Sequence, residues 1–300
     1  MLSRILYEDN DIIVAHKPAG IAVQTARIGQ ADMVSELKNH LRRIGCDGPA
    51  ASRGGEPYLG IVHRLDQPVE GILVFAKTKA AAAALTGQLR AQDDEGGFGK
   101  RYYAVLCGMP TDRQGWLTDH LYKQAVKNGT HIDYIAVVKS ADSGRLDQAG
   151  CQSCPEGQEC PESRKAERTD EEAVAQAPDS QRKGRLKDRQ KSPAGEGKAR
   201  RAVLEYRILQ TREEQGLALA DIRIQTGRFH QIRAQMAHAG MPLLGDSKYG
   251  NQRTLALARS LGIRNVALCA YHLSFLHPAS KREMDFSIRP ENLAFSSFSP

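Results

Sequence analysis

Residues 63–77 read "HRLDQPVEGILVFAK", a charged stretch ending in an aspartate that leads directly into a strongly apolar one. The apolar part, 72–76, is short and rich in β-branched and aromatic residues, which predicts a strand buried in a sheet. A charged "HRLD" is an unusual neighbour for such a strand. Taken alone, Asp66 is interpreted as a turn or cap aspartate, so its role has to be judged from the rest of the chain.

The length and composition are those of a globular protein. The chain has 300 residues, 41% of them hydrophobic, which is enough for one large domain or two smaller ones. Its apolar runs are far too short to span a membrane. The start, "MLSRILYEDNDIIV", lacks the apolar stretch and small-residue cleavage site of a secretory signal. We therefore expect a cytoplasmic protein with no membrane partner.

The charge balance favours a polyanionic partner. The formal net charge is +7 at pH 7. Neutralisation of phosphates by Lys and Arg supplies much of the affinity of proteins for nucleic acid, although many basic proteins bind none. Three of the six cysteines, Cys46, Cys107 and Cys269, are scattered singly, and a chain of this size needs no disulfide framework.

One segment, 141–201, differs in kind from the rest. It contains no aromatic residue and is dominated by Ser, Gly, Pro, Glu, Gln and Lys, so it cannot bury enough apolar surface to offset its ordering entropy. Its 13 Lys or Arg nearly balance its 12 Asp or Glu, so most of the net charge belongs to the remainder. We expect a disordered insertion that divides one folded domain into 1–140 and 202–300.

Three cysteines inside this segment, Cys151, Cys154 and Cys160, have a spacing that a zinc site can use. A closed zinc site needs four ligands, however, and the segment contains no histidine. Solvated cysteines in a flexible loop are the favoured interpretation, with a metal site as the alternative.

The folded parts alternate between short strands and helices. Strands are expected at 5–7, 12–15, 72–76, 102–106, 203–209 and 217–225. Asp32 is a candidate N-cap for a helix that starts at Met33, and Thr78 for a helix at 79–91 that turns Leu85 and Leu89 inward. A third helix is expected at 229–239, ended by Gly240. The mixture lacks a strict βαβ rhythm, which predicts an α+β fold with a mainly antiparallel sheet.

Common catalytic motifs are missing from the sequence. It has no G-x-S-x-G elbow, no Walker A sequence and no H-E-x-x-H, and its histidines show no pair at metal-ligand spacing with a third partner. We therefore expect neither a metal nor a nucleotide cofactor.

Two further stretches contain residues suited to chemistry. In "TGRFHQIRAQMAHAG" at 226–240, Arg228 and Arg233 stand at and near a helix start, where an arginine can hold a carboxylate or phosphate through two hydrogen bonds. A solvated basic helix face is an equally good interpretation of this pattern. In "KRYYAVLCG" at 100–108, Tyr102 lies on an alternating strand, where ordinary core packing is the favoured role.

Taken together, these stretches resemble the RluA-type pseudouridine synthases. Five blocks occur in family order and span the chain apart from the insertion. They are "ILYEDNDIIVAHKPAG", "HRLDQPVEGILVFAK", "KRYYAVLCG", "TGRFHQIRAQMAHAGMPLLGDSKYG" and "LCAYHLSFLHP". The resemblance implies the pseudouridine synthase fold, with flanking helices, a central active-site cleft and a single catalytic domain interrupted by the insertion.

The resemblance also implies an activity, the isomerisation of specific uridines in structured RNA. Asp66 would be the nucleophile, held at the edge of a buried strand, and Arg233 would pair with it and favour its ionised form. Tyr102 would stack on the base, and Arg64 would reach into the RNA. The substrate-binding residues implied in this way are His63, Arg64, Arg228, His230 and Gln231. No cofactor or metal is required, and we expect a monomer.

The sequence departs from the family pattern in two places and leaves several alternatives open. "QPVEG" follows HRLD where the family has a small polar pair and Ser or Thr, and Phe229 replaces a customary threonine. The first block starts almost at Met1, so we expect the compact subgroup without an N-terminal RNA-binding domain. Ribosomal and transfer RNA are both open as substrates, as is attack of Asp66 on the sugar or on the base. The alternative function is that of a non-catalytic RNA-binding or assembly factor.

Overall fold

The computed structural model describes residues 3–27, 29–44, 56–91, 97–128, 131–139 and 198–298. The larger compact unit of the chain comprises residues 1–139 and 195–300. Most of the expected insertion, including Cys151, Cys154 and Cys160, lies outside the described residues. No helix among the described residues combines the length and the apolar content needed to cross a bilayer.

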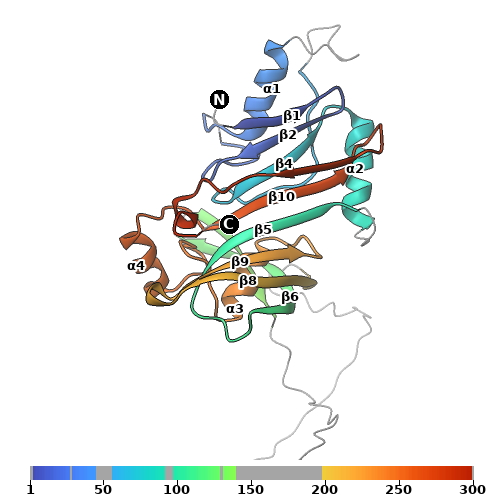
Figure 1. Ribbon diagram of the computed structural model, residues 1–300. Coiled ribbons are helices and arrows are strands. Elements are labelled where there is room, and N and C mark those ends of the chain that lie inside the picture. The colour runs from blue at the N-terminus through green and yellow to red at the C-terminus, as the bar shows by residue number, and fades with distance from the viewer. Residues whose placement is uncertain are drawn as a thin grey trace, which may run out of the picture. The chain divides into compact units, whose positions relative to one another are not determined.

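A single eleven-stranded sheet organises this unit (Figure 1). Its order is β1-β2-β4-β10-β5-β9-β8-β6-β7, with β11 paired to β10 and β3 paired to β4. All described strand pairs are antiparallel except β10 with β4, which confirms the expected α+β fold with a mainly antiparallel sheet. The strands are β1 (Arg4–Glu8), β2 (Ile12–Lys17), β3 (Gly60–Ile61), β4 (Glu70–Ala76), β5 (Gly99–Cys107), β6 (Gln114–Asn128), β7 (His131–Val138), β8 (Arg200–Arg212), β9 (Leu217–Ile224), β10 (Leu268–Leu276) and β11 (Glu283–Ser287).

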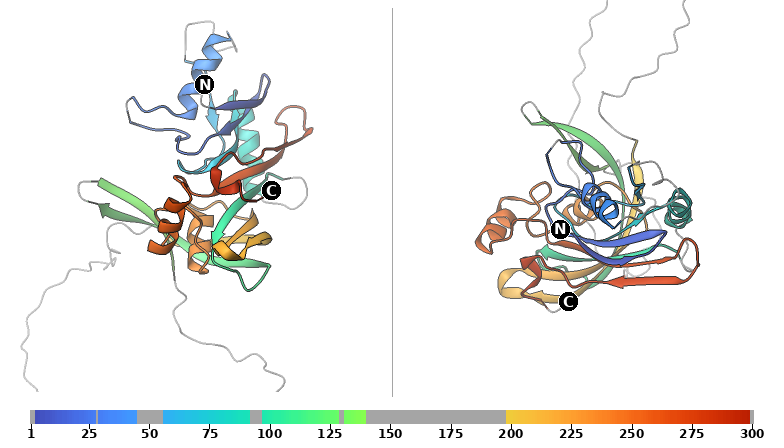
Figure 2. Two further views of the ribbon diagram at one scale, coloured as in Figure 1. Left: turned by 60° about the vertical axis from the view of Figure 1, so that its left-hand side comes forward. Right: turned by 90° about the horizontal axis from the view of Figure 1, so that it is seen from above.

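Four α-helices flank the described part of the sheet (Figure 2): α1 (Met33–Arg43), α2 (Lys79–Ala91), α3 (Gln231–His238) and α4 (Gln252–Ser260). The two expected N-caps are confirmed. The Asp32 side chain accepts a hydrogen bond from the Ser35 N–H at 2.7 Å, and the Thr78 hydroxyl accepts one from the Ala81 N–H at 3.1 Å. Each bond satisfies an N–H that has no partner within the helix.

The expected start of the third helix was wrong by two residues. Helix α3 begins at Gln231 because His230, its N-cap, has φ 51° and lies in the left-handed region. Of the two leucines expected to point inward from α2, Leu85 is fully buried and Leu89 is partly exposed.

The apolar run that follows "HRLD" is strand β4, and every residue of β4 is buried. Its odd residues, Leu73 and Phe75, pack with α1, while its even residues, Ile72 and Val74, pack with α2. Helices cover both faces of this part of the sheet, so the strand is continuously hydrophobic and not alternating.

Strand β4 passes very close to β10 where the two pair in parallel. Gly71 pairs with Ala270 and has φ +145°, a conformation that side chains rarely allow. A Cβ atom at Gly71 would lie 2.5 Å from the Cβ of Ala270. The glycine in "QPVEG" is therefore required by the close approach of the two strands.

The long hairpin of β6 and β7 was not expected from the sequence, and neither was α4. Strand β8 starts at Arg200, inside the range assigned to the insertion. The hairpin and β8 form the edge of the sheet next to α3.

Candidate active site

Asp66 lies on the tight turn between β3 and β4. The turn is closed by a hydrogen bond from the Val69 N–H to the Asp66 carbonyl at 3.0 Å. The next carbonyl, that of Gln67, accepts hydrogen bonds from the Lys17 ammonium at 3.0 Å and from the Gly20 N–H at 2.9 Å. The Asp66 side chain itself is 25% exposed. The backbone at Asp66 is therefore fixed, while its carboxylate stays accessible to a ligand.

Lys17, which helps to fix this turn, is completely buried. Burial lowers the pKa of Lys17 to about 7, although the nearby negative charges of Asp66 and Glu70 act in the opposite direction. A second hydrogen bond from its ammonium reaches the Pro18 carbonyl at 3.0 Å. Both acceptors are backbone carbonyls, so Lys17 joins two loops of the protein.

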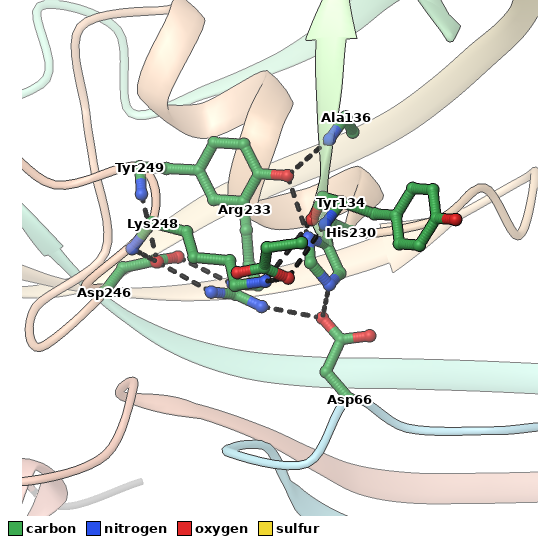
Figure 3. Close-up of polar contacts among 9 residues, drawn as sticks. Asp66, Tyr134, Ala136, His230, Arg233, Asp246, Lys248 and Tyr249 are labelled. Carbon is green, nitrogen blue, oxygen red and sulfur yellow. Dashed lines mark hydrogen bonds and ion pairs between the residues drawn. The ribbon is translucent and has the colours of Figure 1, made fainter. Parts of the chain in front are cut away.

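Arg233 pairs with the candidate nucleophile, Asp66, and with a buried aspartate, Asp246. Its Nη1 donates to Asp66 Oδ2 at 3.0 Å, while Nε and Nη2 donate to the two carboxylate oxygens of Asp246 at 2.7 and 2.8 Å (Figure 3). Arg233 is 3% exposed, and the side chain of Asp246 is fully buried. The expected pairing of Arg233 with Asp66 is present in the geometry, together with a second partner that was not expected.

Asp246 also organises the loop behind Arg233. Its Oδ1 accepts hydrogen bonds from the N–H groups of Lys248 at 2.9 Å and Tyr249 at 3.2 Å. Burial opposes the charged form of Arg233, but the hydrogen bonds and charge of Asp246, with those of Asp66, outweigh it and raise the pKa of Arg233. The guanidinium is therefore charged and held in one orientation.

His230 provides a second contact to Asp66. Its Nε2 lies 3.5 Å from Asp66 Oδ2, and its Nδ1 lies 2.8 Å from the Tyr249 hydroxyl, which also accepts a hydrogen bond from the Ala136 N–H at 2.7 Å (Figure 3). Burial, aided by the positive charges of Arg233 and Lys248, lowers the pKa of His230 to about 4. The imidazole is neutral at pH 7, and a hydrogen on Nε2 directed at Asp66 satisfies every group in this network.

Tyr102 lies on β5 in the core that also contains Val69, and it is 6% exposed. Burial, together with the negative charge of Asp66, raises the pKa of the Tyr102 hydroxyl, so it stays protonated at neutral pH. Leu65 and Val69, which flank the Asp66 turn on either side, pack in the same core as Tyr102. Of the three expected catalytic residues, Asp66 and Arg233 are therefore in direct contact, and Tyr102 shares a core with the neighbours of Asp66.

The expected substrate-binding residues occupy different environments. Arg64 is exposed, and its guanidinium donates to the Gln24 side chain at 3.2 Å. Arg228 is partly exposed and donates to the Arg201 carbonyl at 2.9 Å. Gln231 is buried, and its amide accepts from the Arg228 N–H and donates to the Val203 carbonyl, both at 3.0 Å. Gln231 therefore holds the turn before α3 in place through both polar atoms of its amide.

His63 lies outside the Asp66 network, and its role as a substrate-binding residue stays a prediction. It is buried, and its Nε2 accepts a hydrogen bond from the Val74 N–H at 3.2 Å, in the gap of β4 where neither β10 nor β3 pairs. Burial, together with the positive charge of Lys100, holds the pKa of His63 well below its usual value. His63, the first residue of "HRLD", therefore supplies a hydrogen-bond acceptor for the Val74 N–H of β4, while Arg64 faces solvent.

Three residues of the cluster, Lys17, Asp246 and Tyr249, were not identified from the sequence. Asp246 and Tyr249 belong to "GDSKYG" at 245–250, which lies within the fourth block and has the composition of a turn. Lys17 precedes a proline in the first block. The only available signal was membership of these blocks, since a buried role for an aspartate or a lysine depends on tertiary contacts.

One group in the described part of the chain, Asp9, Asp11 and His277, has its donor atoms close enough to hold a metal ion. The Asp9 carboxylate already accepts hydrogen bonds from two backbone N–H groups, from the Tyr7 hydroxyl and from His277. The other nitrogen of His277 accepts from the Ala279 and Ser280 N–H groups. These groups satisfy one another, so the cluster is explained as a turn that fixes the two chain segments.

Comparison with known proteins identifies the family. A family model described as RNA pseudouridylate synthase matches residues 11–238. The chain is 29% identical to the ribosomal large subunit pseudouridine synthase D of Zymomonas mobilis, over 94% of this chain and 67% of that protein. It is 27% identical to an uncharacterized RNA pseudouridine synthase of Aquifex aeolicus, over 95% of this chain and 68% of that protein. The chain thus spans about two thirds of the length of these relatives.

The fold agrees with this assignment. The solved structure of human RNA pseudouridylate synthase domain containing 4 matches with a TM-score of 0.57 and 19% identity, over 96% of this chain and 88% of that one. The family match covers most of the sequence, and several relatives are named as type D synthases of the ribosomal large subunit. The expected RluA-type resemblance is therefore confirmed, and the chain belongs to the RNA pseudouridylate synthase family of isomerases.

Proposed function

We propose that the protein isomerises specific uridines of ribosomal or transfer RNA to pseudouridine, with Asp66 as the nucleophile. The observation that carries the proposal is the geometry of Asp66, whose carboxylate is accessible and hydrogen-bonded at 3.0 Å to Arg233. Arg233 is in turn held by the buried Asp246. The relatives named after the ribosomal large subunit favour ribosomal RNA.

The reaction rearranges a uridine without adding or removing atoms overall. The bond between N1 of uracil and the anomeric carbon breaks, the base turns, and a bond forms between C5 and the same carbon. The hydrogen of C5 leaves to solvent and N1 gains one, so no oxidant or reductant takes part. The base has to stay in the site while detached, and in a folded RNA it first has to be flipped out of its stack.

The residues of the cluster have distinct roles in this scheme. Asp66 attacks either the anomeric carbon or the uracil ring, and its turn is anchored so that the carboxylate enters in one orientation. Arg233 supplies a fixed positive charge opposite the carboxylate. Tyr102, whose hydroxyl stays protonated because burial raises its pKa, stacks on the uracil. Arg64, exposed two residues before Asp66, contacts the surrounding RNA.

Release of tritium from RNA labelled at C5 of uridine tests the nucleophile. The wild-type protein should release tritium, and Asp66→Asn should lose at least about 100-fold of the rate while binding RNA nearly as well, because a covalent step is removed. Residual turnover above a few per cent of wild type would exclude Asp66 as the nucleophile. Mapping pseudouridine on RNA from a strain that lacks the gene identifies the substrate.

Arg233→Ala separates a catalytic partner of Asp66 from a phosphate contact. We expect turnover of bound RNA to fall far more than RNA affinity, because two carboxylates surround the guanidinium. An RNA titration and a pH–rate profile measure the two effects. A large loss of affinity that weakens with salt, with turnover of bound RNA intact, would make Arg233 a backbone contact instead.

The alternative, a non-catalytic RNA-binding or assembly factor, predicts the opposite result in the tritium-release assay and in the pseudouridine map. The wild-type protein would release no tritium from any cellular RNA, and the pseudouridine map of the deletion strain would not change. The pairing of the accessible Asp66 carboxylate with the buried Arg233 favours the enzyme.

A further inference from the structure

Two large aromatic side chains beside the candidate site are exposed to solvent. Phe229 is 40% exposed, and Tyr134 of β7 is 42% exposed. The Phe229 ring stacks on His230 with a centroid separation of 3.7 Å and an interplanar angle of 20°. His230 is the residue whose Nε2 lies 3.5 Å from Asp66. Phe229 is therefore separated from the candidate nucleophile by a single imidazole ring.

Tyr134 lies on the strand that also touches the His230 network. It is two residues before Ala136, whose N–H donates to the Tyr249 hydroxyl. Side chains two residues apart on a strand lie on the same face, so Tyr134 extends this face of β7 beyond the hydrogen-bonded cluster. Figure 3 shows its ring outside the network of dashed contacts. The residue directly opposite Tyr134 on β6 is Ala125, whose side chain is small.

The ammonium group of one lysine lies near both aromatic rings. The ammonium of Lys123, on β6, lies 3.8 Å from the centre of the Tyr134 ring and 5.1 Å from the centre of the Phe229 ring. Lys123 is exposed, as are Lys139, Arg200 and Arg201 around the base of the β6–β7 hairpin. The nearby acid Asp133 is paired with Lys248 at 2.6 Å, so it does not cancel this positive charge.

Exposed aromatic rings with a positive charge beside them are suited to single-stranded RNA. Every nucleobase has a face that stacks on an aromatic side chain, and a lysine next to the ring can pair with the phosphate of the same nucleotide. We propose that Tyr134, Phe229 and Lys123 form a stacking platform for a nucleobase adjacent to the uridine held at Asp66. This inference rests on the proposed function, and it assigns the neighbouring nucleotide a binding site that tolerates any base.

The test uses the full-length protein and a fluorescein-labelled RNA of twelve uridines, with binding followed by fluorescence anisotropy at several salt concentrations. Tyr134→Ala and Phe229→Leu should each weaken binding by about 5-fold or more, because a stacked base is lost. Tyr134→Phe should bind as the wild type does, because stacking requires the ring and not the hydroxyl. Trp116→Ala, which removes an aromatic residue that is 54% exposed elsewhere on β6, is the matched control and should have no effect.

Salt dependence separates stacking from charge. Lys123→Gln should make log Kd less dependent on log salt by about 0.7, the contribution of one phosphate contact to a single strand, whereas Tyr134→Ala should leave the slope unchanged. Polyphosphate, which has charges but no bases, should bind wild type and Tyr134→Ala equally well. Unchanged oligouridine binding by both Tyr134→Ala and Phe229→Leu, or a change in salt slope in the Tyr134 variant, would overturn the proposal.

Failure of this inference is distinguishable from failure of the proposed function. Tritium release by the wild-type protein tests the enzyme without reference to the platform. If the wild type releases tritium and the aromatic variants bind normally, only the platform is wrong. If the wild type releases none and the aromatic variants bind weakly, the protein has the stacking platform but not the activity.

Discussion

Arg233 contacts Asp66 through the one guanidinium nitrogen that Asp246 leaves free. Asp246 binds the other two, so its buried carboxylate determines the direction in which the third points. The two aspartates differ in exposure. The Asp66 side chain is 25% exposed, whereas that of Asp246 is not exposed at all. One aspartate is available to a substrate, and the other positions the arginine.

Replacing Asp246 by Asn should therefore impair catalysis, although residue 246 itself does not contact the substrate. An amide keeps one acceptor but presents N–H groups to a guanidinium that needs a second acceptor, so Arg233 loses its fixed orientation. We expect kcat to fall at least about 100-fold with RNA affinity nearly unchanged. The free energy of unfolding should fall by about 3–5 kcal/mol, as for other broken buried ion pairs. Tritium release, RNA titration and urea denaturation measure the three quantities.

Asp133→Asn is the matched control for this prediction. Asp133 pairs with Lys248 in the same region, but its side chain is 47% exposed. Loss of this surface pair should change stability by less than about 1 kcal/mol and leave kcat unaltered. If Asp246→Asn turned over RNA as fast as Asp133→Asn does, Asp246 would have no part in orienting Arg233.

The buried His230 should make stability depend on pH. Its pKa is lowered in the folded protein from 6.5 to about 4, so the unfolded chain takes up a proton first as the pH falls. Stability is fully present above pH 6.5 and decreases as the pH falls from 6.5 to about 4, by up to about 3 kcal/mol. His230→Asn should remove this part of the slope in urea denaturation measured across that range.

A slope that is equally steep in wild type and His230→Asn would mean that the pKa of His230 is the same in the folded and unfolded states.

Tyr249→Phe isolates the hydroxyl that links β7 to the site. The variant keeps the ring that lies 5.2 Å from the Arg233 guanidinium but loses the acceptor of the Ala136 N–H and the partner of His230. We expect a loss of about 1–3 kcal/mol in the free energy of unfolding, because a buried N–H is left without a partner. The Ala136 amide should exchange its hydrogen faster than in the wild type, measured by NMR. Unchanged exchange would show that another group replaces the hydroxyl.

The part of the fold that the sequence predicted correctly is the part with local signals. Asp32 and Thr78 are caps of a standard type, and β4 is a short apolar run bounded by turn residues. Strands β6 and β7 were missed because their apolar and polar residues do not alternate cleanly, as both faces of the hairpin carry exposed side chains. The dipeptide Asn128–Gly129 was a hairpin signal that could have been used.

The site was predictable only where a residue stands in a recognisable block. Asp66 and Arg233 are 167 residues apart, and no local pattern indicates that they meet. Asp246 resembles a turn aspartate in sequence, and its burial comes from packing against α3. His63 shows that membership of a block does not predict the contacts of a residue. It stands in the same block as Asp66, but its ring completes a gap in the sheet that could not be predicted without knowing the strand order.

The sequence predicts a disordered insertion between β7 and β8, and we propose that this segment acts as an electrostatic tether. Its ends have to meet two strands that pair with opposite edges of β6. Leu121 of β6 lies opposite both Val138 of β7 and Arg200 of β8. Two strand spacings amount to about 10 Å, and a flexible linker of about six Gly or Ser residues covers that distance.

Replacing 145–196 by such a linker should therefore leave the melting temperature almost unchanged, because loop length affects stability only weakly. Turnover of a short stem-loop carrying the mapped uridine should also survive. Affinity for long RNA should fall modestly at low salt, because the segment contains six Lys or Arg between 182 and 191, opposed by Asp188 alone. The full-length protein with these six residues changed to Gln is the matched control, and it should show the same loss of affinity. A deletion variant that unfolds or cannot modify the stem-loop would mean that the segment packs on the catalytic domain. Stoichiometric zinc in the purified protein, bound by Cys151, Cys154 and Cys160, would also indicate that the segment is structured.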